Sequence, residues 1–242
     1  MLSAKLQDYK VLINKHKGEN AFVVGAGTSL LSLDLSSIHD YVVISVNSGF
    51  LLMPWSTGNP DKRYWLSNDA LVRRWTYWKD VKKSIATKLV RNSWEKYYDE
   101  IPDFLVFWPR HTSEDIIDPK DDGLCYCSSI PTGIDLALFM GVKNIFVLGL
   151  DQYVSGNKRY YWQFWPEKDR PKMFINGMSF NEYLPDIRQQ RWTFKYDMKA
   201  YKALETYSQY MGVKIYNCNP ASLIQTFEKI SFDKVQEKID GT

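Results

Sequence analysis

Polar residues in this chain follow short apolar runs, at places where they could bind a phosphate group. The stretch GAGTS comes directly after the apolar run AFVV. Glycines let backbone N–H groups approach an anion, so the stretch could form a phosphate-binding loop. The loop lacks the third glycine of the dinucleotide fingerprint and the lysine of a P-loop, so an ordinary tight turn is the alternative. The candidate residues are Gly25, Ala26, Gly27, Thr28 and Ser29.

Two asparagines end later apolar runs. Asn47 closes YVVISVN and Asn68 closes KRYWLSN. A side-chain amide offers donors and an acceptor, so this pair could bind a nucleotide, whereas the alternative is that each caps a strand end or a helix. For a binding role we expect Asn68→Ala to weaken nucleotide binding by about 1 to 3 kcal/mol with little change in unliganded stability.

Thr132 and Gly133 follow the stretch CYCSSIP and are expected to open a helix, where free N–H groups can face a ligand. After the later run NIFVLGL comes Asp151, which by itself is more typical of a structural residue. Three tyrosines follow it. A tyrosine hydroxyl can donate to a leaving phosphate, and the alternative role is aromatic packing. These tyrosines are Tyr153, Tyr160 and Tyr161.

Short apolar runs that alternate with helical stretches indicate the elements that must position these residues. We expect strands at AFVVG, YVVISVN, KRYWLSN, DFLVFW, NIFVLG and VKIYNC. Helices are expected over residues 3–16, 69–78 and 80–98, from Pro131 to Gly141, and from Thr193 to Met211.

This alternation predicts an α/β fold: a single Rossmann-like domain over residues 1–242, with a mainly parallel, twisted sheet and helices on both faces. Residues 155–192 lack a clear period and are expected to form a lid insertion. Because ligands of such sheets bind at the carboxyl ends of the strands, the residues that follow the strands are the site candidates.

The composition limits the function classes. The chain of 242 residues has 31 Lys+Arg and 28 Asp+Glu, a net charge of +3 that does not favour nucleic acid as a partner. Aromatic residues make up 15% of the chain, which suggests a ring-lined ligand cleft. Three cysteines without a repeated spacing favour a reducing compartment over a disulfide framework or a zinc site. Without a signal-like or membrane-spanning run, we expect a cytoplasmic protein without a transmembrane segment, with a homo-oligomer left open.

Taken in order, these pieces resemble the bacterial sialyltransferases of glycosyltransferase family 42. More distantly they resemble the Maf flagellin glycosyltransferases and the 6-hydroxymethylpterin diphosphokinases of the MptE-like (DUF115) domain. The stretch GAGTSLLSLDLSSI is similar to the sialyltransferase loop Gly-x-Gly-Pro-Ser-Leu with its following Asp-x-Ser. The family's Ser-Gly helix with its Asp-containing strand end resembles PTGIDLALFMGVKNIFVLGLDQY. Its closing strand and turn resemble VKIYNCNPASLIQTF.

The resemblance implies a GT-A-like sialyltransferase architecture that binds a CMP-sugar without a metal or other cofactor. It implies that the glycine loop and the two asparagines bind the nucleotide, and that Thr132 and Gly133 contact a phosphate or a sugar. The family's paired tyrosines, which assist the departing phosphate, fall on Tyr153 and on Tyr160 or Tyr161.

The chain departs from this family at its general base. The family has a histidine there, whereas this chain has Trp192, which cannot accept a proton. Lys195, Tyr196 and Asp197 lie nearby. A lysine or tyrosine with an ordinary pKa near 10 is mostly protonated at neutral pH, so Asp197 is the candidate base. Its alternative role is a charge at a helix N-terminus.

Three functions follow from these observations. The first is a glycosyltransferase that moves a sugar from a nucleotide, with CMP favoured, to a glycan or other acceptor by direct displacement. The second is a magnesium-dependent diphosphokinase of the pterin type, although LSNDALVRR offers only Asp69 to hold the metal. The third, suggested by Trp192, is a protein that binds a nucleotide or sugar phosphate without catalysis.

Overall fold

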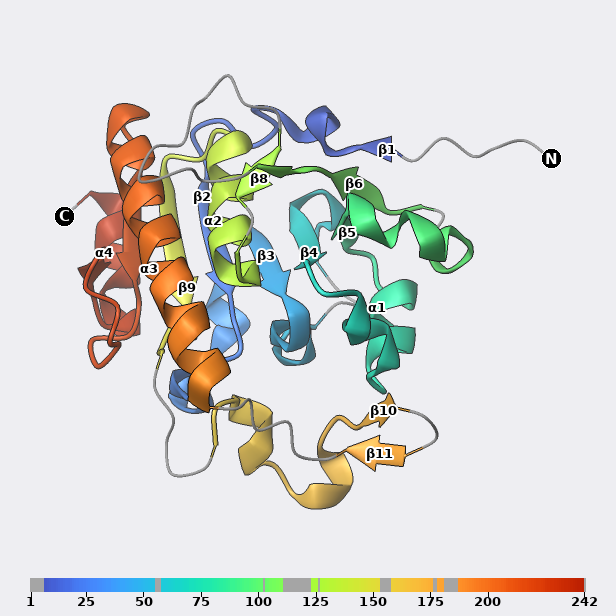
Figure 1. The fold of residues 1–242 in the computed structure, drawn as a ribbon. Coiled ribbons are helices and arrows are strands. Elements are labelled where there is room, and N and C mark those ends of the chain that lie inside the picture. The colour runs from blue at the N-terminus through green and yellow to red at the C-terminus, as the bar shows by residue number, and fades with distance from the viewer. Residues whose placement is uncertain are drawn as a thin grey trace.

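The structure is a computed structural model that describes residues 7–54, 58–101, 103–110, 123–125, 127–152, 158–175, 178–180 and 187–241. Among these residues, one sheet of nine strands forms the centre, and every pair of neighbouring strands in it is parallel. The expected α/β fold with a mainly parallel sheet is confirmed (Figure 1).

In sheet order the strands are β1 (Gln7–Asp8), β6 (Leu105–Phe107), β5 (Thr87–Arg91), β4 (Arg63–Ser67), β3 (Val42–Val46), β2 (Asn20–Val24), β9 (Asn144–Leu148), β12 (Lys214–Asn217) and β13 (Glu228–Lys229). From β2 the chain builds outward through β3, β4, β5 and β6, and then returns to place β9 on the other side of β2. The strand order therefore reverses between β2 and β9, which is where open α/β sheets bind their ligands.

Four α-helices lie in the described part of the chain: α1 (Trp78–Lys83), α2 (Ser129–Phe139), α3 (Ile187–Tyr210) and α4 (Val235–Asp240). Two small ladders accompany the sheet, the parallel pair of β7 (Pro109–Arg110) with β8 (Leu124–Cys125) and the antiparallel pair of β10 (Met173–Ile175) with β11 (Met178–Phe180). Short 3₁₀ helices occupy Tyr9–Leu12, Thr28–Ser32, Leu35–Ile38, Asn47–Leu52, Pro60–Lys62, Ala70–Arg74, Asn92–Glu100, Tyr161–Phe164, Glu167–Asp169 and Phe232–Lys234.

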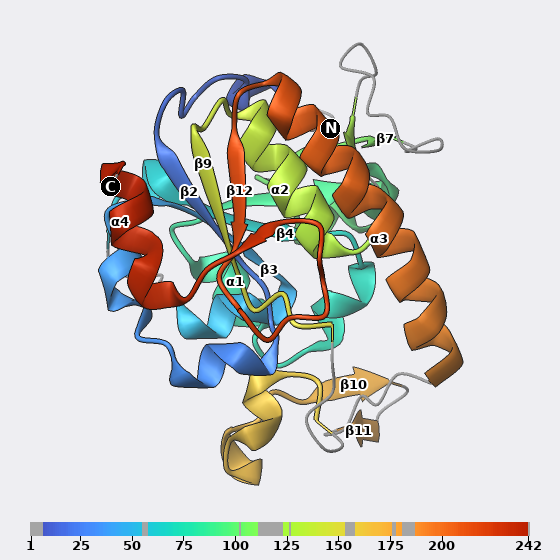
Figure 2. The same cartoon turned by 90° about the vertical axis from the view of Figure 1, so that its left-hand side faces the viewer.

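Both faces of the sheet are buried under packed side chains. Because side chains alternate along each strand, each strand contributes to two separate cores. On β2, Ala21 and Val23 point into a core shared with α2 and α3, whereas Phe22 and Val24 point into a second core. The second core takes Trp78 from α1 and also receives α4. Figure 2 shows α2 and α3 apart from α4, and the helices expected on both faces are thus present.

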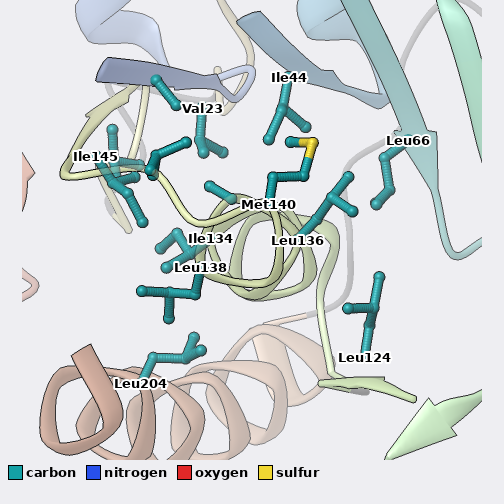
Figure 3. Packing of buried hydrophobic residues seen from close by; sticks show 14 of the residues in the cluster. Val23, Ile44, Leu66, Leu124, Ile134, Leu136, Leu138, Met140, Ile145 and Leu204 are labelled. Carbon is teal, nitrogen blue, oxygen red and sulfur yellow. The ribbon is translucent and has the colours of Figure 1, made fainter. Parts of the chain in front are cut away.

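Helix α2 is buried nearly all around. It lies between the sheet and α3, so that Ile134 and Leu138 pack among Val23 of β2 and Leu204 of α3 (Figure 3). At Gly133, an added Cβ would lie 3.0 Å from a Val23 methyl group. The glycine therefore lets the helix approach the sheet closely, which fixes the position of its N-terminus at the carboxyl edge of the sheet.

Three helix expectations are wrong in the described residues. The predicted helix at 3–16 is replaced from residue 7 onward by β1 and the 3₁₀ helix Tyr9–Leu12. The predicted helix at 80–98 contains only the end of α1, followed by β5 and most of the 3₁₀ helix Asn92–Glu100. Strand pairing with β4 and β6, which buries Leu89 and Val90, overrides the helical propensity of the lysines there. Residues 69–78 form the 3₁₀ helix Ala70–Arg74 and only the first residue of α1.

The described residues 158–175 and 178–180 of the segment expected as a lid lie beside the carboxyl ends of the strands, whereas its residues 187–192 belong to α3. Isolated bridges join Gly27 to Tyr160 and Trp75 to Met173, and Figure 1 shows β10 and β11 at the end of the molecule toward which β3 and β9 point. That this segment closes over a substrate stays a prediction. No helix in the described residues is both long enough and apolar enough to span a bilayer.

Candidate functional site

The glycine loop after β2 binds a carboxylate of the protein itself. Asp151, which follows β9 and is 3% exposed, accepts the Ser29 N–H at 2.9 Å and the Ser29 hydroxyl at 2.5 Å. It also accepts the Thr28 hydroxyl at 3.2 Å and the side-chain amide of Asn219 at 2.8 Å. The two loops at the reversal of strand order, together with the turn after β12, are thus joined through one buried carboxylate.

Gly27 must be a glycine because of this carboxylate. A Cβ added there would lie 2.5 Å from the Asp151 carboxyl carbon. In addition, the Gly25 and Gly27 N–H groups donate to the carbonyls of Leu148 and Gly149. Much of the donor set that the sequence assigns to a phosphate therefore has partners within the protein, and nucleotide binding by Gly25 to Ser29 stays a prediction.

Asn47 lies at the carboxyl end of β3 with a left-handed backbone, at a φ of 49°. Its amide nitrogen donates to the Ser129 hydroxyl at 3.1 Å, and its amide oxygen accepts the Ser67 hydroxyl at 2.8 Å. The side chain thus joins three elements, because Ser67 ends β4 and Ser129 begins α2. This geometry matches the structural alternative for Asn47, while the residue is still only partly buried.

Asn68 is more deeply placed, at 8% exposure. Its amide nitrogen donates to the Thr132 hydroxyl at 2.8 Å and makes longer contacts, both 3.4 Å, with the carbonyls of Cys127 and Ser128. Its amide oxygen is buried and has no hydrogen-bond partner among the described residues. Asn68 therefore holds the N-terminal segment of α2 in place while one polar atom remains unsatisfied.

Thr132 and Gly133 do not open the helix, contrary to the expectation. Helix α2 begins at Ser129, so the free N–H groups of its first turn belong to earlier residues. Thr132 is fully buried, and its hydroxyl lies 2.8 Å from the Cys125 carbonyl, to which it donates. A direct ligand contact by Thr132 or Gly133 stays a prediction.

The two candidate tyrosines that the structure describes, Tyr160 and Tyr161, have different surroundings. Tyr161 is fully buried, and its hydroxyl donates to the Ser48 carbonyl at 2.6 Å; burial raises its pKa. Tyr160 is partly buried beside the glycine loop and stacks on Trp162, with ring centroids 5.5 Å apart. Tyr153 lies outside the described residues. Tyr160 is therefore the better placed of the two described tyrosines to meet a ligand.

Asp197 is a buried carboxyl group at the same edge of the sheet. It lies inside α3 rather than at its start, and it accepts the Ser128 N–H and the Gln152 side-chain amide, both at 3.2 Å. Burial raises its pKa to about 6, although both hydrogen bonds and the nearby Arg159 charge oppose this shift. A carboxyl group with a pKa near neutrality is suited to proton transfer.

Several residues of this site were not identified from the sequence. Gln152, with a left-handed backbone at a φ of 56°, covers one oxygen of Asp197. Tyr201 lies one turn further along α3, with its buried hydroxyl close to Gln152 and Ser128. Arg159 could have been identified from the sequence because it directly precedes the candidate residue Tyr160. Trp192 lies within α3.

Solved structures similar to this chain are found, although no protein-family model and no curated protein matches its sequence. The Maf glycosyltransferase from Magnetospirillum magneticum AMB-1 matches with a TM-score of 0.54 at 14% identity, over 96% of this chain but only 39% of its own length. The sialyltransferase CstII from Campylobacter jejuni, in complex with the substrate analogue CMP-3FNeuAc, matches with a TM-score of 0.48 at 15% identity, over 88% of this chain and 86% of that protein.

The chain thus has the fold of the Maf glycosyltransferase, and the resemblance to that enzyme seen in the sequence is confirmed at the level of the fold. At 14% identity the likeness to the Maf enzyme establishes the fold alone. The further likeness to the pterin diphosphokinases stays a prediction.

Proposed function

We propose that this protein is a glycosyltransferase that takes a sugar from a nucleotide donor, with a CMP-sugar favoured, by direct displacement without a metal. The observation that carries the proposal is Asp197, a buried carboxyl group with a pKa of about 6 at the carboxyl edge of the sheet. It lies close to the reversal of strand order, where the fold class binds ligands.

Asp197 supplies the base in this proposal. The acceptor hydroxyl attacks the anomeric carbon, the bond from that carbon to the phosphate oxygen breaks, and the acceptor proton passes to the carboxylate. Gln152 now donates to one oxygen of Asp197. Because Asp197 is only 1% exposed, an acceptor hydroxyl must displace this amide, replacing one hydrogen bond by another.

The donor phosphate is assigned to the side of the loop that faces Tyr160. Asp151 takes donors of Thr28 and Ser29, and a phosphate placed against the same donors would meet a buried negative charge. Arg159 and Tyr160 lie beside the loop, where a guanidinium group and a phenol can stabilise the charge that develops on the leaving phosphate.

A second function has an observation of its own. If the Asp151 contacts keep the donor phosphate out of the loop, the protein would bind a nucleotide or sugar phosphate without transferring the sugar. Trp192 in place of the histidine expected from the sequence resemblance agrees with this second function.

Thermal unfolding with CMP, CDP, UDP and ATP, each with magnesium and with a chelator, tests the proposal. A ligand at about 100 times its dissociation constant adds roughly 2.7 kcal/mol to stability, which raises the midpoint by several degrees. We expect CMP or CDP to raise it equally with and without magnesium. A shift with ATP and magnesium alone would favour the diphosphokinase, and no shift with any nucleotide would contradict nucleotide binding.

A further inference from the structure

Two of the three cysteines touch each other and have no part in the proposed reaction. Cys125 and Cys127 have their sulfur atoms 3.5 Å apart, whereas Cys218 lies in the core on the other face of the sheet. A disulfide needs about 2.05 Å between the sulfurs, so a modest movement separates this contact from a bond.

We propose that Cys125 and Cys127 form a reversible dithiol–disulfide site that low-molecular-weight disulfides oxidise. The Cys127 thiolate attacks the small disulfide, forms a mixed disulfide and releases one thiol. Cys125 then attacks the Cys127 sulfur, a second small thiol leaves, and the protein disulfide forms. Two protein thiols and one small disulfide thus give one protein disulfide and two small thiols. This inference does not depend on the proposed function.

Exposure sets the order of attack. Cys127 is partly exposed and Cys125 is buried, so a reagent from solution meets Cys127 first. The hydrogen bond with Cys125 and burial raise the pKa of Cys127, and Asp197 on α3 adds to this effect. Since the thiolate is the nucleophile, exchange should be slow at neutral pH and accelerate up to about tenfold for each pH unit below that pKa.

Backbone groups around this cysteine pair form hydrogen bonds with residues of the candidate site. The Cys125 N–H donates to Asp135 at 2.6 Å, and the Cys127 carbonyl lies 3.4 Å from the Asn68 amide nitrogen. The next residue, Ser128, donates its N–H to Asp197. Closing the disulfide therefore pulls on the segment that holds both Asn68 and Asp197.

Incubation of the full chain with oxidised glutathione at pH 7 and pH 8.5, followed by intact mass and peptide mapping, tests the proposal. We expect the wild type to lose two hydrogens between Cys125 and Cys127, faster at pH 8.5, and to regain them with a reducing thiol. Cys125→Ser should instead accumulate a glutathione adduct on Cys127. Cys218→Ser is the matched control and should behave as the wild type does.

A stable glutathione adduct on Cys127 of the wild type would overturn the proposal, because Cys125 would have failed to displace it. Unmodified cysteines at pH 8.5 would also overturn it. A trivalent arsenical, which bridges adjacent thiols, provides a second measurement on the wild type in case Cys125→Ser does not fold. We expect one arsenical per chain, bound so that glutathione no longer oxidises the pair, and the absence of binding would contradict the site.

Discussion

Ser29 donates both its backbone N–H and its hydroxyl to the two carboxylate oxygens of Asp151, across 122 positions of sequence. The contact joins the loop after β2 to the loop after β9, the two strands between which the strand order reverses. The position where related architectures place an anionic ligand thus already holds a carboxylate that is integral to the chain.

Removing that carboxylate should destabilise the fold. Asp151→Ala leaves the donors of Ser29 and the buried amide of Asn219 without an acceptor, so we expect a loss of roughly 3 kcal/mol or more in urea unfolding. Asp151→Asn keeps an acceptor and should lose less. Asp99→Ala, at an exposed position, should change stability by less than about 0.5 kcal/mol. Equal, small effects at both positions would contradict the cross-link.

The geometry of Asn68 changes the expectation drawn from the sequence. Because Asn68 is buried and donates to Thr132, Asn68→Ala should cost about 1 to 3 kcal/mol of unliganded stability. The measurement is urea unfolding with and without CMP. A variant as stable as the wild type that binds CMP more weakly would instead restore the direct-binding role.

Asp197 should make stability depend on pH. Its pKa in the folded protein, about 6, lies above the ordinary value of 3.8, so the folded state binds more protons than the unfolded state between these values. Stability from this group is therefore lost as pH rises from about 4 to 6, by about 3 kcal/mol in total. Asp197→Asn removes the titration, so the variant should gain on the wild type as pH rises. Parallel stability curves from pH 4 to 7 would contradict the shift.

Arg110 and Asp135 form a buried ion pair next to the cysteine pair. Arg110→Ala leaves the Asp135 carboxylate buried without a counter-charge, and we expect a loss of about 3 to 5 kcal/mol at pH 7. Burial already raises the pKa of Asp135, and without the guanidinium it should rise further, so the loss should shrink in acid. Urea unfolding at pH 5 and pH 8 measures this. A loss independent of pH would point to packing of the Arg110 side chain instead.

The neighbouring tyrosines should separate stability from catalysis. Tyr161→Phe removes a buried hydroxyl that donates to Ser48, so stability should fall by about 1 kcal/mol. Tyr160→Phe removes the hydroxyl of the tyrosine whose backbone pairs with Gly27 of the glycine loop, and the rate of nucleotide release should fall by about 10²-fold. Thermal unfolding and a nucleotide-release assay on both variants give the comparison. A reversed pattern would show that Tyr161, not Tyr160, meets the donor.

The sequence predicts the parts of this fold that depend on local pattern. Strands β2, β3 and β9 are mostly apolar runs, and α2 is an apolar helix with Pro131 in its first turn and Gly141 shortly after its end. Strand β5 was missed because its lysine and arginine suit a helix, and only pairing with β4 and β6 makes the segment extended.

The candidate site divides in the same way. Asn47 and Asn68 follow their strands as the pattern predicts, because position after a strand is a local property. The roles of Asp151 and Gln152 depend on partners far away in sequence, Ser29 and Asp197, and no spacing in the chain indicates them. Helix α2 begins at Ser129, so its free N–H groups belong to residues before Thr132. The sequence did not predict this boundary, because helix ends depend on their tertiary surroundings.

Release of nucleotide from CMP-sugars, measured from pH 5 to 8 in the wild type and in Asp197→Asn, shows whether Asp197 is the base of a sugar transfer. We expect metal-independent release that rises with pH around an apparent pKa near 6 in the wild type. In Asp197→Asn the release should be lower by about 10²-fold or more and lack that pH dependence. Equal release by both proteins would contradict the assignment of Asp197 as the base, and no release from any CMP-sugar by a protein that binds CMP would favour the non-catalytic function.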